Sequence, residues 1–185
     1  IHYYAQAPNS FTAVNSKNIN LVFVFEKNGA KAETAESRAT IGWDRDYFNT
    51  QMAADQENLT WDKIKGSNTD AAEVTSNLTL PQCMSSSVNT AWSKITWTSS
   101  DKSVISFKDT GWGSLIDAKE GVVTPQQEDK EVTLTATFNA NDRLLNGYVE
   151  KVSDFATLTK EFKVTVKGTG ISKPTEKELQ AILDK

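Results

Sequence analysis

Alternation of apolar and polar side chains is the clearest pattern along this chain. Residues 132–138 place apolar side chains on one side of an extended backbone and threonines on the other. Residues 162–166 repeat the apolar alternation, and Ile95 and Trp97 alternate with threonines. A period of two is typical of a strand with one face in the core and one in water, as in antiparallel sheets. Several such strands separated by turn signals predict an all-β sandwich or barrel.

A strand of a different kind is predicted near the start of the chain. The run 21–25 reads Leu-Val-Phe-Val-Phe and carries apolar side chains on both faces, as a central strand covered on two sides would. It ends at Asn28-Gly29, a pair that favours a tight hairpin turn. Because an exposed run of this kind invites association, we expect residues 1–54 to add at least one strand to the same globule as the rest of the chain.

Helical signals occur in two places. Residues 44–65 contain no Gly or Pro, and their apolar residues are poorly spaced for a strand, so short helices or helical turns are expected there. Near the end of the chain, Thr175 and Glu178 have the spacing of a capping box, and apolar residues follow on one helical stripe. We expect a short C-terminal helix, with residues 171–185 forming a linker and helix toward a following module.

The composition is that of a folded chain without a basic surface. Its 185 residues are 38% hydrophobic and 24% charged, which suffices for one domain with a real core. The net charge of −4 gives no electrostatic footprint for nucleic acid or anionic lipid, since both require clustered Lys and Arg. The longest apolar run is only a strand's length, whereas a membrane-spanning helix needs about 20 residues. We therefore expect neither nucleic-acid binding nor membrane insertion.

Scarce cysteine and histidine limit the chemistry. Cys83 is the one cysteine and His2 the one histidine, so an intrachain disulfide, the usual zinc sites and a histidine-activated nucleophile are excluded. Paired carboxylates would still allow a glycosidase, for which Asp44, Asp46 and Glu57 are candidates. Because 24 acidic residues make such pairs common on a surface, we expect no enzyme activity, no metal site and no cofactor.

Short motifs in a fixed order resemble those of a known family. The motifs are Leu78-Thr-Leu-Pro81, Ile95-Thr-Trp-Thr-Ser-Ser-Asp101, Val104-Ile-Ser106, Gly121-Val-Val-Thr-Pro125, Val132-Thr-Leu-Thr-Ala-Thr137 and Lys160-Glu-Phe-Lys-Val-Thr-Val166. With them the chain resembles the bacterial immunoglobulin-like modules sometimes called atrophied bacterial Ig domains. The resemblance implies an Ig-like antiparallel β-sandwich over residues 55–168, in a secreted or cell-surface protein, commonly beside carbohydrate-active modules. Such modules are generally non-catalytic, and no catalytic residue carries over.

Three segments inserted into the family pattern carry aromatic side chains. Trp92 lies in the first, Trp112 in the second and Tyr148 in the third. Loops on a rigid scaffold are where binding residues usually occur, so the insertions favour a ligand site over a plain spacer. Two alternatives stay open: Trp92 could cover a sheet edge, and Tyr148 could be a cross-strand residue beside a hairpin turn.

An aromatic site for a sugar is the most specific hypothesis. Sugar rings stack their apolar C–H face on flat aromatic side chains and hydrogen-bond polar groups beside them. Trp43 suits this role because Asp44 and Arg45 follow directly, and the alternative is a helix start capped by aspartate with a buried tryptophan. Trp97 and Trp61 are expected in the core. The candidate ligand-binding residues are Trp43, Asp44, Arg45, Trp92, Trp112 and Tyr148.

Two functions fit these observations. The first is a non-catalytic extracellular module that binds a polysaccharide, such as an α-glucan or a plant glucan, through exposed loop aromatics. The second is a structural spacer or adhesion module that positions neighbouring modules of the same polypeptide and binds no sugar. The first requires the loop tryptophans to be exposed and to meet on one surface.

Overall fold

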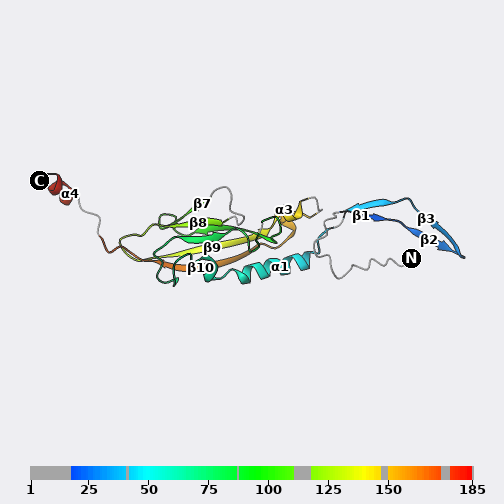
Figure 1. Ribbon diagram of the computed structural model, residues 1–185, viewed down its shortest axis with the longest axis horizontal. Coiled ribbons are helices and arrows are strands. Elements are labelled where there is room, and N and C mark those ends of the chain that lie inside the picture. Colours follow the sequence, from blue (N-terminus) through cyan, green and yellow to red (C-terminus); the bar gives the residue numbers. More distant parts are fainter. Residues whose placement is uncertain are drawn as a thin grey trace.

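Antiparallel strands are the main regular structure of the described residues. The computed structural model describes residues 18–40, 42–86, 88–110, 118–146, 150–171 and 176–184, with side chains in all of these ranges except 18–21, 38–40 and 177–179. Its strands pair antiparallel in small sheets, and few helices accompany them (Figure 1). The predicted all-β class is confirmed.

The first sheet contains the strands with the clearest alternation. It consists of β6 (Ser93–Ser99), β9 (Lys130–Ala140) and β10 (Leu158–Val166), in the order β10-β9-β6. Both pairings are antiparallel, and Trp97 lies opposite Ala136. Alternate side chains of β9 are buried from residue 132 onward, so the inward and outward faces follow the predicted period of two.

The second sheet has shorter strands, and a glycine allows two of them to pack closely. Its strands are β5 (Leu78–Pro81), β8 (Ala118–Val123) and β7 (Ile105–Asp109), in the order β5-β8-β7. Gly121 lies opposite Leu78 in the register of β5 with β8. A Cβ atom at Gly121 would lie 3.1 Å from the Cβ of Leu78, so glycine permits this approach.

One hydrophobic core joins the two sheets. Its buried side chains come from both sheets and from flanking segments: Leu59, Ile64, Val74, Leu78, Leu80, Ile95, Trp97, Val104, Ile105, Val132, Leu134, Ala136, Phe138, Val164 and Val166. Trp97 is 7% exposed, and its Nε1 donates to the carbonyl of Pro81 at 2.9 Å, which satisfies the buried indole N–H. Trp61 is half-buried against this core. The core position predicted for Trp97 is confirmed, and Trp61 packs at its margin.

A long helix packs against the first sheet. α1 (Arg45–Asn58) buries Phe48 and Met52, which lie one turn apart on the same face. The Nε2 of Gln56 donates to a carbonyl of β10 at 2.7 Å. After α1 comes the single turn α2 (Trp61–Ile64). The helical structure predicted for this stretch is confirmed and includes a 14-residue helix.

Three shorter helices follow later in the chain. α3 (Asp142–Leu145) and the 3₁₀ turn η1 (Val152–Asp154) lie between β9 and β10. α4 (Glu176–Leu183) confirms the predicted C-terminal helix. Thr175, the predicted capping residue, lies outside the described residues.

A two-stranded ribbon precedes α1. β1 (Asn18–Leu21) pairs with β4 (Ser37–Thr40), and β2 (Val24–Lys27) pairs with β3 (Ala30–Glu33). The turn predicted at Asn28-Gly29 is confirmed, because both residues have positive φ, at 53° and 82°. Figure 1 shows this ribbon at one end of the two-sheet body and α4 at the other.

The prediction that the run 21–25 is covered on both faces is wrong for its described side chains. Val22, Phe23, Val24 and Phe25 are 43% to 58% exposed. The physical reason is that β2 pairs with β3 in a two-stranded ribbon, and neither strand contributes to the described core clusters. Within the first 54 residues, the described side chains buried against the main body belong to α1.

Candidate functional site

Five aromatic side chains gather where α1 begins. We call Trp43, Tyr47, Phe48, Trp92 and Phe155 the aromatic cluster. Neighbouring rings lie 4.4 to 5.7 Å apart between centroids, and four of the five contacts are edge to face. This geometry is favourable because the positive edge of one ring meets the negative face of another.

The start of α1 positions three of the five rings. The Oδ1 of Asp44 accepts from the backbone N–H of Tyr47 at 3.0 Å and so caps the helix. Trp43 precedes the cap and contacts Phe48 in the first turns, an arrangement known as a hydrophobic staple. The alternative interpretation of this stretch, a helix start capped by aspartate, is confirmed. A sugar-binding role for Asp44 stays a prediction.

Trp92 reaches the same place from a distant part of the chain. The backbone N–H of Asn141 donates to the carbonyl of Trp92 at 3.0 Å, and its Nδ2 donates to the carbonyl of Ala91 at 2.8 Å. The Trp92 ring then lies edge to face with Trp43 at 5.4 Å and with Tyr47 at 5.7 Å. The structure therefore brings together two of the sequence-predicted aromatic residues, Trp43 and Trp92.

Only part of the aromatic cluster is accessible. Phe48 and Phe155 belong to a second buried core, and Trp43 and Trp92 pack against that core. Both tryptophans are half-buried, whereas Tyr47 is 45% exposed. A ligand would therefore meet the Tyr47 ring and the outer parts of the two indoles. Tyr47 was not among the predicted binding residues, although its spacing of four from Trp43 on a predicted helix would have indicated a shared face.

Charged groups lie beside the cluster. The Nη2 of Arg45 is 3.8 Å from the Oδ2 of Asp154, and both side chains are solvent-accessible. Asp154 also accepts from the backbone N–H of Lys151 at 2.8 Å, which fixes its carboxylate. Glu150 places its carboxylate against Gly42, where a larger side chain would collide with it. These groups offer donors and acceptors next to an aromatic surface.

The two remaining predicted site residues are not placed by the structure. Trp112 and Tyr148 lie outside the described residues, so their relation to the aromatic cluster stays a prediction.

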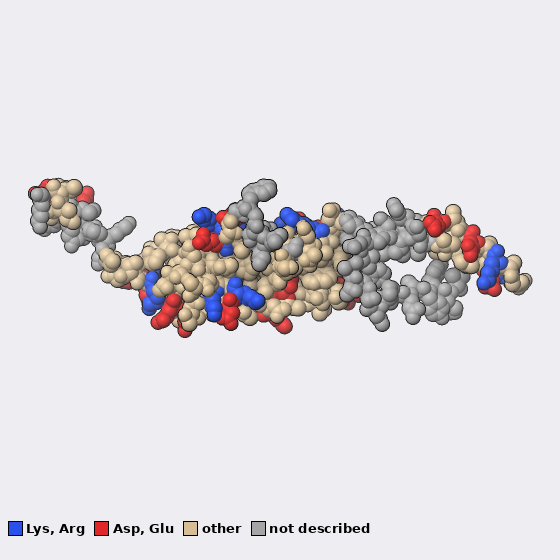
Figure 2. Space-filling model, in the orientation of Figure 1, with Lys and Arg blue, Asp and Glu red and all other residues tan. Residues whose placement is uncertain are grey.

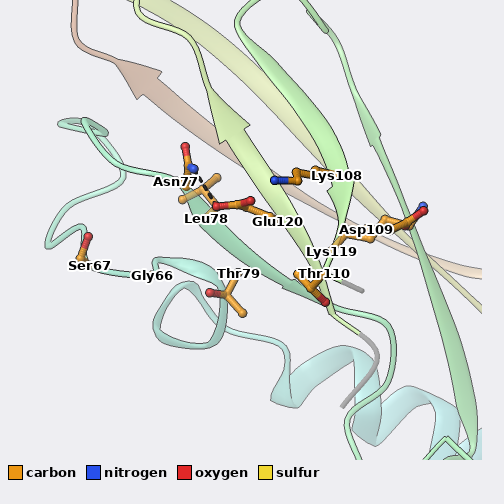
Figure 3. A pocket seen from close by; sticks show the side chains of 10 residues that line it. All are labelled: Gly66, Ser67, Asn77, Leu78, Thr79, Lys108, Asp109, Thr110, Lys119 and Glu120. Atoms are coloured by element: carbon orange, nitrogen blue, oxygen red, sulfur yellow. Dashed lines mark hydrogen bonds and ion pairs between the residues drawn. The ribbon is translucent and has the colours of Figure 1, made fainter. Parts of the chain in front are cut away.

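A groove on the second sheet forms another candidate site. It has a volume of about 700 Å³ and lies over β5, β8 and β7 (Figure 3). Polar side chains that line it are Ser67, Asn77, Thr79, Lys108, Asp109, Thr110, Lys119 and Glu120.

The groups in this groove are engaged with each other. The Nδ2 of Asn77 donates to the Oε1 of Glu120 at 2.8 Å, and Glu120 lies between Thr79 and Lys108 in the strand register. All ten residues that line the groove are non-aromatic, so it offers no ring on which a sugar could stack. The sequence did not indicate the groove, because the pairing of β5 with β8 joins residues 37 to 43 positions apart.

Charges on the body are of mixed sign. Figure 2 shows Lys and Arg interspersed with Asp and Glu on the visible face of the two-sheet body. A surface of this kind has no strong field that would select a highly charged polymer.

One half-buried carboxyl group couples α1 to the first sheet. The Oδ2 of Asp55 accepts from the backbone N–H of Ser93 at 3.1 Å. Burial raises the pKa of Asp55 above its ordinary value of 3.8, and hydrogen bonds from Ser93 partly oppose the shift. Its contact with β6 makes this a structural rather than a ligand-binding position.

Two further findings concern the described part of the chain alone. No group of three or more His, Cys, Asp or Glu side chains there is arranged to hold a metal ion. Its helices are all too short or too polar to cross a membrane.

Comparison with protein-family models, with curated proteins and with solved structures finds no match to this chain.

Proposed function

We propose that this chain is a non-catalytic extracellular module that binds a polysaccharide through the aromatic cluster. The observation that carries the proposal is the contact of Trp92 with two rings from a segment far away in sequence, those of Trp43 and of the exposed Tyr47. Arg45 and Asp154 lie beside these rings and add hydrogen-bonding groups. An apolar surface with polar groups at its margin matches the two kinds of surface that a sugar ring presents.

We further propose that the two three-stranded sheets are the layers of an Ig-like sandwich. Their antiparallel pairing and shared core support this fold. In such a scaffold the aromatic cluster lies at one end, where the segment before β6 and the start of α1 meet. A rigid body of this kind holds the rings in place before a ligand arrives, which lowers the entropy lost on binding.

Binding by a single small aromatic surface is expected to be weak. Tyr47 offers one ring at 45% exposure, and the indoles add only their outer parts. Affinity would increase if several such modules act together on one polymer, because the later binding events become intramolecular. The glycan partner would then be a repetitive polysaccharide, such as an α-glucan or a plant glucan.

Affinity gel electrophoresis against a panel of polysaccharides tests the proposal. We expect at least one polysaccharide to retard the unmodified chain, and Tyr47→Ala to abolish the retardation while the chain stays folded, because the ring is partly exposed and lies outside the buried core. Phe25→Ala is the matched control, since it removes an exposed aromatic ring from the ribbon instead. Retardation by none of the polysaccharides, or equal retardation of the chain and Tyr47→Ala, would contradict the proposal.

A second candidate function is favoured by a different observation. The ribbon and α4 extend from opposite ends of the two-sheet body (Figure 1), as suits a spacer that separates neighbouring modules. In that case Trp43 and Trp92 serve to close the second core, against which both pack. A chain that is retarded by no polysaccharide would support this spacer or adhesion function.

A further inference from the structure

The ribbon exposes a run of apolar side chains to solvent. Four consecutive apolar side chains, Val22 to Phe25, are 43% to 58% exposed. A contiguous exposed apolar patch marks an interaction site more often than isolated exposed residues do. A two-stranded ribbon is also marginally stable by itself, so a third strand would stabilise it.

The hydrogen-bonding pattern of the ribbon shows which backbone groups are free for another strand. The N–H of Thr34 donates to the carbonyl of Phe23 at 3.0 Å, so this is a hydrogen-bonded pair. Hydrogen-bonded and non-hydrogen-bonded pairs alternate along antiparallel strands. Phe25 and Ala32 lie opposite each other two positions further on, so they also form a hydrogen-bonded pair.

It follows that two residues of β3 direct their backbone groups away from β2. Lys31 and Glu33 occupy the non-hydrogen-bonded positions of the β2–β3 ladder, opposite Glu26 and Val24. Their N–H and C=O groups point to the outer edge of β3. Among the described strands, β3 is paired only with β2, so this edge is open.

We propose that the open edge of β3 pairs with β3 of a second copy of this chain, in antiparallel register about a two-fold axis at Ala32. In this register Lys31 lies opposite Glu33 of the second copy, and Glu33 lies opposite its Lys31. Lys31 and Glu33 are also the residues whose backbone N–H and C=O groups point to the open edge. The same register therefore satisfies both the backbone hydrogen bonds and the pairing of opposite charges. Opposite charges directly across a strand pair are favourable.

The sequence of β3 makes a second copy a better partner than an unrelated strand. A lysine on an edge strand usually discourages association, because it would be buried against another sheet without a counter-charge. Here Lys31 already lies 3.8 Å from the carboxylate of Glu26 on β2, and in the self-pairing Glu33 of the second copy gives it a counter-charge on the other side as well. An unrelated strand would need the same spacing of opposite charges.

The pairing would also extend an apolar face. Phe25 lies opposite Ala32, so both side chains are on one face of the ribbon. In the proposed four-stranded sheet the row runs from Phe25 through Ala32 to the Ala32 and Phe25 of the second copy. The small alanines at the centre allow the two phenylalanines to lie over them from both sides.

The outer edge of β2 is the alternative site of association. A two-fold axis at Val24 would place Phe23 opposite Phe25 of the second copy, which is favourable for aromatic packing. It would place Val22 opposite Glu26, however, so it pairs no opposite charges. The β3 edge is therefore the one proposed, and it is independent of the glycan-binding proposal.

Cysteine cross-linking tests the register. Ala32→Cys is made in a chain carrying Cys83→Ala, since Cys83 is the one native thiol and is buried. In the proposed pairing the two introduced thiols lie in a non-hydrogen-bonded pair, with Cα atoms about 4.5 Å apart, which suits a disulfide. Oxidised glutathione accepts the two electrons and is reduced as the two thiols lose their protons. We expect a covalent dimer.

Ala30→Cys in the same background is the matched control. In the proposed register the two copies of this position are four residues out of step, roughly 13 Å along the strands, so no disulfide should form. Val24→Cys reports on the β2 edge. Cross-linking through Val24→Cys without cross-linking through Ala32→Cys, or equal cross-linking through Ala30→Cys, overturns the proposal.

Charge exchange provides a second readout that needs no cysteine. Lys31→Glu places like charges opposite each other twice, and we expect the dimer dissociation constant to rise roughly tenfold or more. Both Lys31→Glu and the double variant K31E/E33K lose the ion pair with Glu26 inside the ribbon, so the two differ in the pairing between copies. The double variant restores both opposite-charge pairs between the copies and should restore dimerisation. Sedimentation over a range of concentrations measures both. A chain that stays monomeric throughout, or a double variant as weak as Lys31→Glu, overturns the proposal.

Discussion

At the scale of single residues, the sequence pattern predicts burial correctly where a side chain lies on the inward face of a strand. Trp97 alternates with threonines and is buried, as predicted, because its face of β6 points into the shared core. Trp43 and Trp92 have no such pattern around them, and their half-burial depends on contact with each other and with Phe48. The periodicity of a strand predicts which side chains turn inward, but it cannot show which distant loop residue will cover another.

A side chain larger than that of Gly121 would collide with the core. Gly121→Ala adds a methyl group 3.1 Å from the Leu78 Cβ and 3.2 Å from the Leu80 Cδ1. We expect the free energy of unfolding to fall by about 1–3 kcal/mol, as overpacking usually costs. Urea denaturation measures the change. Thr79→Ala, an exposed change in the same sheet, should stay within about 0.5 kcal/mol of the unmodified chain, and an equal loss in both variants would argue against the packing explanation.

Asp55 gives a pH dependence whose sign follows from burial. Its pKa is raised in the folded state, so the folded chain binds this proton more tightly than the unfolded chain does. The stability contributed by Asp55 therefore decreases as pH rises from 3.8 through the raised pKa. Asp55→Asn does not titrate and can still accept from Ser93. We expect its stability relative to the unmodified chain to increase between about pH 3 and about pH 7.

Urea denaturation at both pH values measures this difference. Asp55→Ala is the matched control, because it also lacks the charge but leaves the buried N–H of Ser93 without its acceptor. It should be less stable than Asp55→Asn at either pH. A difference between Asp55→Asn and the unmodified chain that is constant or decreases with pH would contradict the predicted sign.

At the scale of elements, the N-terminal cap of α1 connects local sequence to the candidate site. Asp44 fixes where the helix begins, and this start places Trp43, Tyr47 and Phe48 around one point. The sequence indicated both a cap and a sugar ligand for Asp44. The cap was predictable because it involves residues three positions apart, whereas a ligand contact depends on what else lies nearby.

Asp44→Ala should weaken the start of α1. Losing the cap is expected to lower the free energy of unfolding by about 1 kcal/mol. Asp44→Asn keeps an oxygen that can accept from the N–H of Tyr47, so it should be close to the unmodified chain. Thermal unfolding followed by circular dichroism compares the two. If both substitutions cost the same, the charge of Asp44 rather than its capping hydrogen bond is responsible.

At the scale of the whole molecule, burial is distributed unevenly. The two three-stranded sheets share one core and α1 closes a second, while the ribbon of β1 to β4 contributes to neither described cluster. Local opening is easiest where few apolar contacts must be broken. The ribbon and the two-sheet body should therefore differ in stability, although they belong to one chain.

Hydrogen exchange measures this difference. At a concentration low enough to keep the chain monomeric, we expect the amides of β9 to exchange more slowly than those of β2 and β3 by a factor of roughly 10³ or more. At high concentration the amides of Lys31 and Glu33 should gain protection if β3 pairs with a second copy. Equal protection of β9 and the ribbon in the dilute sample would contradict the uneven distribution of burial.

The sequence by itself determined the alternating strands β6, β9 and β10, the hairpin turn at Asn28-Gly29, the all-β class and the inward position of Trp97. These depend on local geometry, because alternation and turn propensity act over a few residues. Only the tertiary structure decided that Val22 to Phe25 are exposed, that Trp43 and Trp92 meet beside Tyr47, and that a polar groove crosses the second sheet. An apolar pattern indicates that burying a side chain lowers the free energy, but it does not specify the partner that covers the side chain. That partner comes from elsewhere in the chain or, as proposed for β3, from a second copy.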